Sequence, residues 1–207
     1  MPLQLDVKKL NVGEVAVLKG DQKMSGGFMM VGIGWDARKT PGTAIDADPA
    51  IVGRNAAGEC TALENVCYFN NPKTPWLQHS GDNVTGEGEL DQTGDDERMW
   101  IDLAKVPADV THIDIYAHIF EGKAKKQTFG DLSKGQIRIC DASSMTDITG
   151  AEKVRVELTE DALFDATGVL FVQIQRHGPT WDVKRVDNAD PKFADVNAAV
   201  NAISPAL

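Results

Sequence analysis

Short runs in which apolar and polar residues alternate recur along the whole chain, and they predict β-strands. Residues 112–120 show the pattern best, because Ile113, Ile115, Ala117 and Ile119 alternate with polar or aromatic residues. This period of two places one set of side chains in a core and the other on the opposite face, toward solvent or a partner.

Nine further segments have the composition of strands and are separated by turns rich in Gly, Asn, Asp and Pro. They cover residues 15–18, 28–35, 45–53, 65–69, 99–103, 136–141, 152–158, 168–177 and 180–186. About ten short strands with few helices predict an all-β fold, in which two packed antiparallel sheets form a β-sandwich.

One amphipathic helix is predicted near the C-terminal end, over about residues 191–203. Asp190 is a suitable N-cap, Pro191 occupies the first helical position, and apolar residues follow at helical spacing. Because no internal repeat or linker interrupts the chain, residues 1–207 are expected to form a single domain.

The charge and cysteine content exclude several classes of protein. A net charge of −10 argues against nucleic acid as a partner. No apolar run approaches the roughly 18 residues that span a bilayer, and residues 1–20 lack the pattern of a signal peptide, so we expect no direct membrane insertion and a cytoplasmic protein. Cys60, Cys67 and Cys140 form no CxxC motif and are expected to be free, buried thiols.

Most of the negative charge lies in one stretch. Residues 82–97 hold seven acidic side chains and no basic one, so that without them the net charge would be −3. At roughly 4–6 Å and an effective dielectric constant of about 20, each pair of like charges costs about 3–4 kcal/mol. Such a loop either stays solvated or binds cations, and composition alone leaves both alternatives open.

The side chains and glycines of this loop favour calcium among the cations. Carboxylates, an asparagine and a bendable backbone supply many oxygen atoms. Calcium takes about six to eight oxygen ligands, whereas magnesium keeps more water. Zinc and copper prefer His or Cys, which the loop lacks.

A second acidic group lies upstream and consists of Asp36, Asp46 and Asp48. Asp46 and Asp48 are two residues apart on a predicted strand, so they share a face. If that strand end meets the 82–97 loop, the two groups form one metal site or two adjacent ones. His79, three residues before Asp82, would then either support the site or cap a turn.

Several motifs, in the same order along most of the chain, together resemble the TerD family. They are Gly-Ile-Gly-Trp-Asp (32–36), Tyr-Phe-Asn-Asn (68–71), His-Ser-Gly-Asp-Asn-Val-Thr-Gly-Glu-Gly (79–88), Gly-Asp-Asp-Glu (94–97), Asp-Leu-Ala-Lys-Val-Pro-Ala-Asp-Val (102–110), Gln-Thr-Phe-Gly (127–130) and Arg-His-Gly-Pro-Thr-Trp (176–181).

The resemblance implies a β-sandwich that binds one or two calcium ions through acidic loops at one end. It also implies a cytoplasmic role in tellurite resistance, stress responses and phage defence, together with other Ter-type proteins, and no enzymatic activity. The candidate metal ligands are Asp36, Asp46, Asp48, Asp82, Asn83, Glu87, Gly88, Asp91, Asp95, Asp96 and Glu97.

The sequence departs from the family pattern at two places. Ala44 stands where the family usually has an acid, with Asp48 as a neighbouring acid that could compensate, and residues 90–93 look like an insertion in the acidic loop. Two other functions stay open beside the calcium-dependent interaction module. One is a calcium-assisted hydrolase, with His79 as the candidate base, and the other is a scaffold whose acidic loop binds no metal.

The histidines on the predicted 112–120 strand do not add a second metal site. His112 and His118 share one face, but six residues of strand separate them by about 20 Å. We therefore interpret both as solvent-facing side chains.

Overall fold

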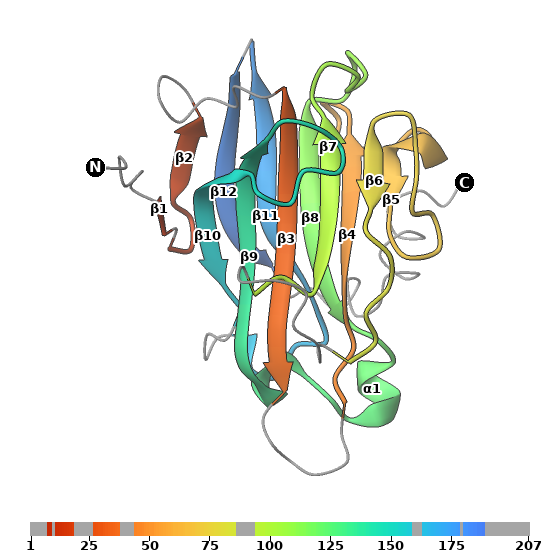
Figure 1. Cartoon of the computed structure of the whole chain (residues 1–207), viewed down its shortest axis with the longest axis vertical. Helices are drawn as coiled ribbons and strands as arrows, with labels where there is room; N and C mark the ends of the chain where they lie inside the picture. Colours follow the sequence, from red (N-terminus) through yellow and green to blue (C-terminus); the bar gives the residue numbers. More distant parts are fainter. Residues whose placement is uncertain are drawn as a thin grey trace.

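In the part of the chain that the structure describes, twelve strands make up two six-stranded sheets that stack face to face (Figure 1). The computed structural model describes residues 8–9, 11–18, 27–37, 44–85, 94–158, 163–178 and 180–188. We call the sheet nearer the viewer in Figure 1 the front sheet and the other the back sheet.

The front sheet contains, in spatial order, β1 (Lys8–Lys9), β10 (Ala151–Glu157), β9 (Leu132–Ala142), β3 (Phe28–Ala37), β7 (Glu97–Asp102) and β6 (Leu77–His79). The back sheet contains β2 (Val15–Leu18), β12 (Thr180–Asn188), β11 (Gly168–His177), β8 (His112–Ile119), β4 (Ala47–Arg54) and β5 (Val66–Cys67). All neighbouring strands pair antiparallel except β1 and β10, which are parallel.

The predicted all-β sandwich is therefore confirmed, and most strand boundaries fall within a few residues of those expected. The sequence patterns missed β1 and β6, which have two and three residues and are too short to show a period of two. They also missed the four-residue helix α1 (Gly122–Lys125). The predicted helix over 191–203 lies outside the described residues.

The main core lies between the two sheets and is built from the inward-facing residues of each strand. Val31 and Ile33 of β3 belong to the same core as Ile113 and Ile115 of β8, and all four residues are at most 1% exposed. Apolar side chains that alternate along both sheets thus bury one face of each sheet against the other, as the period of two requires.

The outer face of β8 is also buried, which corrects the expectation that its polar side chains face solvent. Tyr116 and His118 are 0% and 1% exposed. A second apolar cluster, to which Cys60, Val66 and Tyr68 contribute, covers this part of the back sheet. The alternation in β8 predicted correctly which residues share a face, but it could not show that another segment packs on the polar side.

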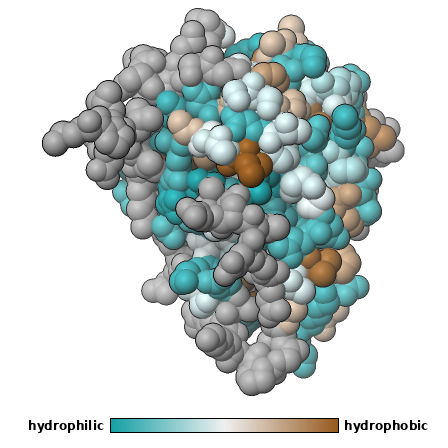
Figure 2. Space-filling model, in the orientation of Figure 1, coloured by the Kyte–Doolittle hydropathy of each residue, from teal (hydrophilic) through white to brown (hydrophobic). Residues whose placement is uncertain are grey.

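The three cysteines are free and buried, as expected. None of the described helices is long and apolar enough to cross a membrane. On the face shown in Figure 2, hydrophobic residues are few and scattered among hydrophilic ones.

Candidate metal centre

Three carboxylates meet at the start of β4. Asp46 directly precedes this strand, Asp48 is its second residue, and Asp82 belongs to the loop that follows β6. One oxygen atom from each carboxylate lies within 4.8 Å of the others. Since β4 lies in the back sheet and β6 in the front sheet, this acidic group joins the two layers of the sandwich.

The backbone that carries Asp46 is held from several sides. Trp35 Nε1 donates a 2.8 Å hydrogen bond to the carbonyl of Ile45, and Gln127 Nε2 donates a 2.9 Å bond to that of Ala44. The backbone N–H of Phe120 donates to the Asp46 carbonyl over 2.8 Å. The carbonyls of residues 44–46 are thus all held by hydrogen bonds, which fixes the backbone that carries the Asp46 carboxylate although these residues are not part of a strand.

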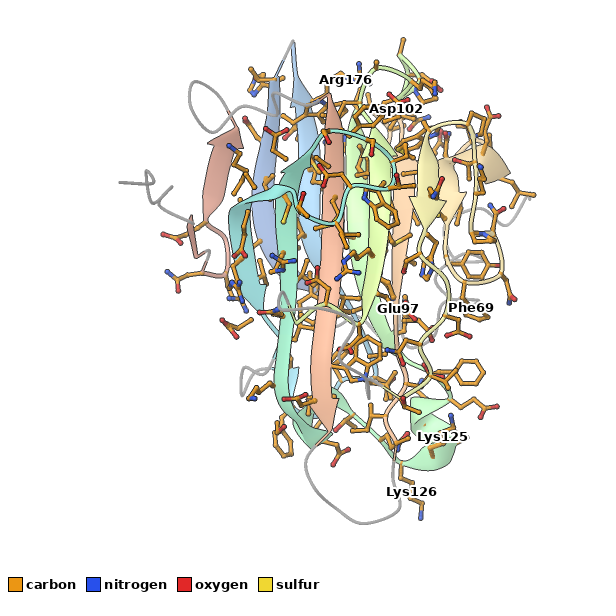
Figure 3. The ribbon with its side chains drawn as sticks, viewed as in Figure 1. Phe69, Glu97, Asp102, Lys125, Lys126 and Arg176 are labelled. Atoms are coloured by element: carbon orange, nitrogen blue, oxygen red, sulfur yellow. The ribbon has the colours of Figure 1, made fainter. Side chains whose placement is uncertain are left out.

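Glu97, the first residue of β7, points toward the same group from the front sheet. It is 1% exposed, and its Oε1 atom accepts a 2.6 Å hydrogen bond from the backbone N–H of Asn83. Its Oε2 atom lies 3.2 Å from Nε2 of His79. In Figure 3, Glu97 lies nearer than Asp102 to the end of the sandwich where Lys125 is found, although Glu97 and Asp102 are the first and last residues of β7.

His79 supports this arrangement from inside the sandwich. Its Nδ1 atom accepts a 3.0 Å hydrogen bond from the backbone N–H of Gly81, and its side chain is fully buried beside Glu97. It therefore both orders the turn before Asp82 and contacts a candidate ligand, so the two roles considered for it from sequence are combined.

Burial and mutual repulsion raise the proton affinity of the acidic group. Burial, followed by the charges of Asp46, Glu97 and Asp82, raises the pKa of Asp48 to about 8. Burial and the neighbouring Asp82 raise the pKa of Asp46 to about 6. Burial also raises the pKa of Glu97. Lys125 opposes the effect at both aspartates, but it does not cancel it.

One buried oxygen of this group, Oδ1 of Asp46, lacks a hydrogen-bond donor among the described residues. Oε2 of Glu97, by contrast, faces Nε2 of His79. A buried carboxylate oxygen without a donor is costly, and proteins usually satisfy it with a donor, a water or a metal ion. An all-oxygen set with an unsatisfied oxygen and uncompensated negative charge fits calcium better than zinc or copper.

Asp95 does not join this group, although it lies in the same acidic loop. Arg138 donates to both of its oxygens, from Nε over 2.7 Å and from Nη2 over 2.5 Å. Arg98 adds a 3.3 Å contact from its Nε atom. The Asp95 carboxylate thus has its charge and its acceptors satisfied by arginine.

Asp96 and Asp36 lie near each other. Oδ2 of Asp96 accepts a 2.7 Å hydrogen bond from the backbone N–H of Trp35. Burial, and then the charge of Asp36 among others, raises the Asp96 pKa to about 6. Asp36 itself is exposed and lies 3.1 Å from Nζ of Lys134.

The remaining candidates have other surroundings. The side-chain oxygen of Asn83 accepts hydrogen bonds from Thr85 within its own loop. Glu87, Gly88 and Asp91 lie outside the described residues.

Sequence reasoning did not single out Trp35, Gln127 or Arg138. The contacts of Gln127 with Ala44 and of Arg138 with Asp95 span 83 and 43 residues of chain, and that of Trp35 with Ile45 spans ten. The alternation of Arg138 with Ile137 and Ile139 marks it as outward-facing, but no local pattern identifies its partner.

Comparisons with known proteins agree with the resemblance seen in the motifs. A family model described as the TerD domain matches residues 8–191. The tellurium resistance protein TerD of Alcaligenes sp. is 35% identical over 176 residues, which cover 84% of this chain and 85% of that protein. General stress protein 16U of Bacillus subtilis (strain 168) is 32% identical over 156 residues, covering 74% and 76%.

A similar fold occurs among solved structures. The crystal structure of a homologue of telluride resistance protein (TerD) from Streptomyces coelicolor A3(2) superposes with a TM-score of 0.57 at 16% identity. The match covers 83% of this chain and 96% of that one. At this identity the likeness supports the fold alone.

Proposed function

Since this chain belongs to the TerD family, we propose that it is a calcium-binding module of the tellurium-resistance and stress-response type. In this proposal it acts in the cytoplasm through calcium-dependent contacts with other proteins, Ter-type proteins among them. It is not an enzyme.

One observation carries the calcium proposal: three carboxylates converge within 4.8 Å and the Asp46 Oδ1 atom is buried without a donor. Asp46, Asp48, Asp82 and Glu97 would hold the ion. A bound calcium ion would neutralise their charge and supply the partner that Oδ1 of Asp46 lacks. Among the candidate ligands, Asp36 and Asp96 lie close enough to interact and could hold a second ion.

Calcium binding would also order a loop whose charges repel one another. Asp82 stands at one end of the 82–97 stretch and Glu97 at the other. The Asn83 N–H already donates to Glu97 across these ends. An ion that contacts both Asp82 and Glu97 would reinforce this contact and hold the loop ends in one arrangement that a partner could recognise. We propose this ordering as the basis of calcium-dependent interaction.

The structure offers little to a hydrolase. The side chain of His79, the candidate base, is fully buried and contacts Gly81 and Glu97. A general base needs access to a substrate or to a reacting water molecule. No observation in the described residues favours catalysis over binding.

Isothermal titration of chelator-treated protein with calcium tests the proposal, with magnesium as the comparison ion. We expect calcium binding in the range of roughly 10⁻⁷–10⁻⁵ M that is usual for sensor proteins, and weaker binding of magnesium. The Asp46→Asn/Asp48→Asn double variant should lose calcium binding, because it removes two charges and keeps the shape. Asp109→Asn, at an exposed acid in the loop after β7, should bind like the wild type.

Wild-type protein that binds no calcium up to millimolar concentration would contradict the proposal. The acidic loop would then act as a metal-free charged surface.

A further inference from the structure

The outer face of the front sheet carries a buried ion pair, and from it the chain continues within two residues to the candidate metal centre. Arg138, on β9, contacts both oxygens of Asp95, and the Asp95 residue is 1% exposed. Two parallel charge-assisted hydrogen bonds fix direction as well as distance. Glu152 contacts Arg138 from the other side, over 3.1 Å, which holds the guanidinium in place.

Strand β3, beneath this pair, has glycines at the two positions where the segment with Asp95 crosses it. A Cβ atom on Gly32 of β3 would lie 2.4 Å from the Asp95 carboxylate, and one on Gly34 would lie 1.7 Å from the carbonyl oxygen of Gly94. Any side chain at either position would expel the segment. The Gly-Ile-Gly motif therefore leaves the space in which residues 94–95 cross the outer face of β3.

Asp95 and Glu97 point to opposite faces of the front sheet. Asp95 lies over Gly32 on the outer face, whereas Glu97 points between the sheets toward His79. Two residues this far apart share a face in a regular strand, so the chain must bend between them. The bend lies at Asp96, whose N–H donates to the Ile33 carbonyl over 2.8 Å and whose carboxylate accepts from Trp35.

We propose that Arg138 is a positioning residue for the calcium site, acting through Asp95. Its two hydrogen bonds to Asp95 fix one side of the bend at Asp96. The bend in turn sets the direction in which the Glu97 side chain points toward the group formed by Asp46, Asp48 and Asp82. Asp95 is thus an anchor of the loop and not a ligand of the ion. The inference rests on the proposed calcium binding and assigns to the opposite face of the sheet a part in setting its affinity.

The test compares Arg138→Met with Arg54→Met by calcium titration and thermal unfolding. Arg54 is a matched control, because it forms a comparable ion pair with Asp114 in the back sheet, with side chains 15% and 3% exposed. Both variants should lower the melting temperature of the calcium-free protein. Only Arg138→Met should weaken calcium binding, by about 10- to 100-fold, as is usual when a residue that orients a metal ligand is removed.

Arg138→Lys provides a milder variant if Arg138→Met fails to fold. Lysine keeps the charge but cannot span both carboxylate oxygens, so we expect a smaller loss of calcium affinity than with Met. Amide hydrogen exchange without calcium gives an independent readout. The N–H groups of Asp96 and Asn83 should exchange faster in the Arg138 variants, because their hydrogen bonds to Ile33 and Glu97 depend on the bend. In Arg54→Met their exchange rates should be the same as in the wild type.

The outcomes separate the two proposals. Wild-type protein that binds no calcium overturns the proposed function and, with it, the influence of Arg138 on affinity. Wild-type protein that binds calcium while the Arg138 variant that folds binds it equally well overturns the positioning role alone. Equal losses in the Arg138 and Arg54 variants would also overturn it, since they would reflect general destabilisation.

Discussion

At the scale of single residues, the acidic group behaves as a set of carboxylates that the protein does not neutralise. Asp48 is 3% exposed, and burial, followed by the charges of three acidic neighbours, raises its pKa to about 8. Asp95 has almost the same burial, but arginine holds it. The contrast shows that burial alone does not define the candidate site. The type of partner does, and in the proposed function a cation from solution would be the partner of the first group.

The raised pKa of Asp48 predicts how the stability of the calcium-free protein depends on pH. The folded state binds a proton more tightly than the unfolded chain, so stability falls as the pH rises from about 4 through about 8. Asp46, with a pKa of about 6, adds to the fall in the lower part of this window. Thermal unfolding with a chelator should therefore give a lower melting temperature at pH 8.5 than at pH 5, by about 2–4 °C for each kcal/mol lost.

Asp48→Asn should flatten this dependence, because its amide does not titrate. Asp109→Asn should keep the slope of the wild type, since its carboxylate is exposed. Identical slopes in the wild type and in Asp48→Asn would show that Asp48 is not the group that titrates in this window.

At the scale of elements, the short helix α1 lies beside the candidate site and is flanked by residues with unusual backbone angles. Glu121 and Lys126 flank the helix, and both have left-handed φ angles, 54° and 56°, without being glycine. Such angles cost roughly 1–2 kcal/mol for most residues. The hydrogen bonds of Phe120 and Gln127 to residues 44–46 lie directly outside the helix, so the tight turn at each end brings both donors to the acidic segment.

This geometry predicts opposite effects for two similar lysines. Lys126→Gly should stabilise the protein by about 0.5–1 kcal/mol, because glycine adopts the left-handed region without strain. Lys123→Gly should destabilise it by about 1 kcal/mol, because glycine is unfavourable inside a helix. Both lysines are exposed, and chemical denaturation measures both changes. Loss of stability with Lys126→Gly would argue against strain at this position.

At the scale of the whole molecule, the candidate site connects the two sheets of the sandwich. Asp46 and Asp48 belong to the start of β4 in the back sheet, whereas Asp82 and Glu97 follow β6 and begin β7 in the front sheet. An ion held by both sets would act as a crosslink between the layers. The charge repulsion that now opposes their approach would become an attraction to a shared cation.

Calcium should therefore stabilise the whole fold and not only the loop. At a free concentration of about 100 times the dissociation constant, the gain in unfolding free energy should be about 2.7 kcal/mol. Differential scanning calorimetry with calcium and with a chelator measures it, and the transition should move as one cooperative unit. The Asp46→Asn/Asp48→Asn variant should show no calcium-dependent shift. A shift of the same size in that variant would place the ion elsewhere.

The prediction from sequence succeeded where the signal is local. Alternation in residues 112–120 and strand-like composition between turns elsewhere identified the long strands, and the ordered set of motifs, GIGWD and GDDE among them, indicated the family. It failed for β1 and β6, where pairing with a neighbour, and not the segment itself, makes the strand. It also failed for His118, where packing of a distant segment decides burial.

The sequence by itself determined the all-β sandwich, the family and the concentration of acidic side chains, because hydrophobic period and charge density are properties of neighbouring residues. Only the tertiary structure decided which acids meet. It brought Asp82 to Asp46 and Asp48 across 36 and 34 residues of chain, and it turned Asp95 away to Arg138. The physical reason is that strand pairing and sheet packing set distances between residues far apart in the chain, and a carboxylate becomes part of a metal site or an ion pair according to the neighbours that this packing provides.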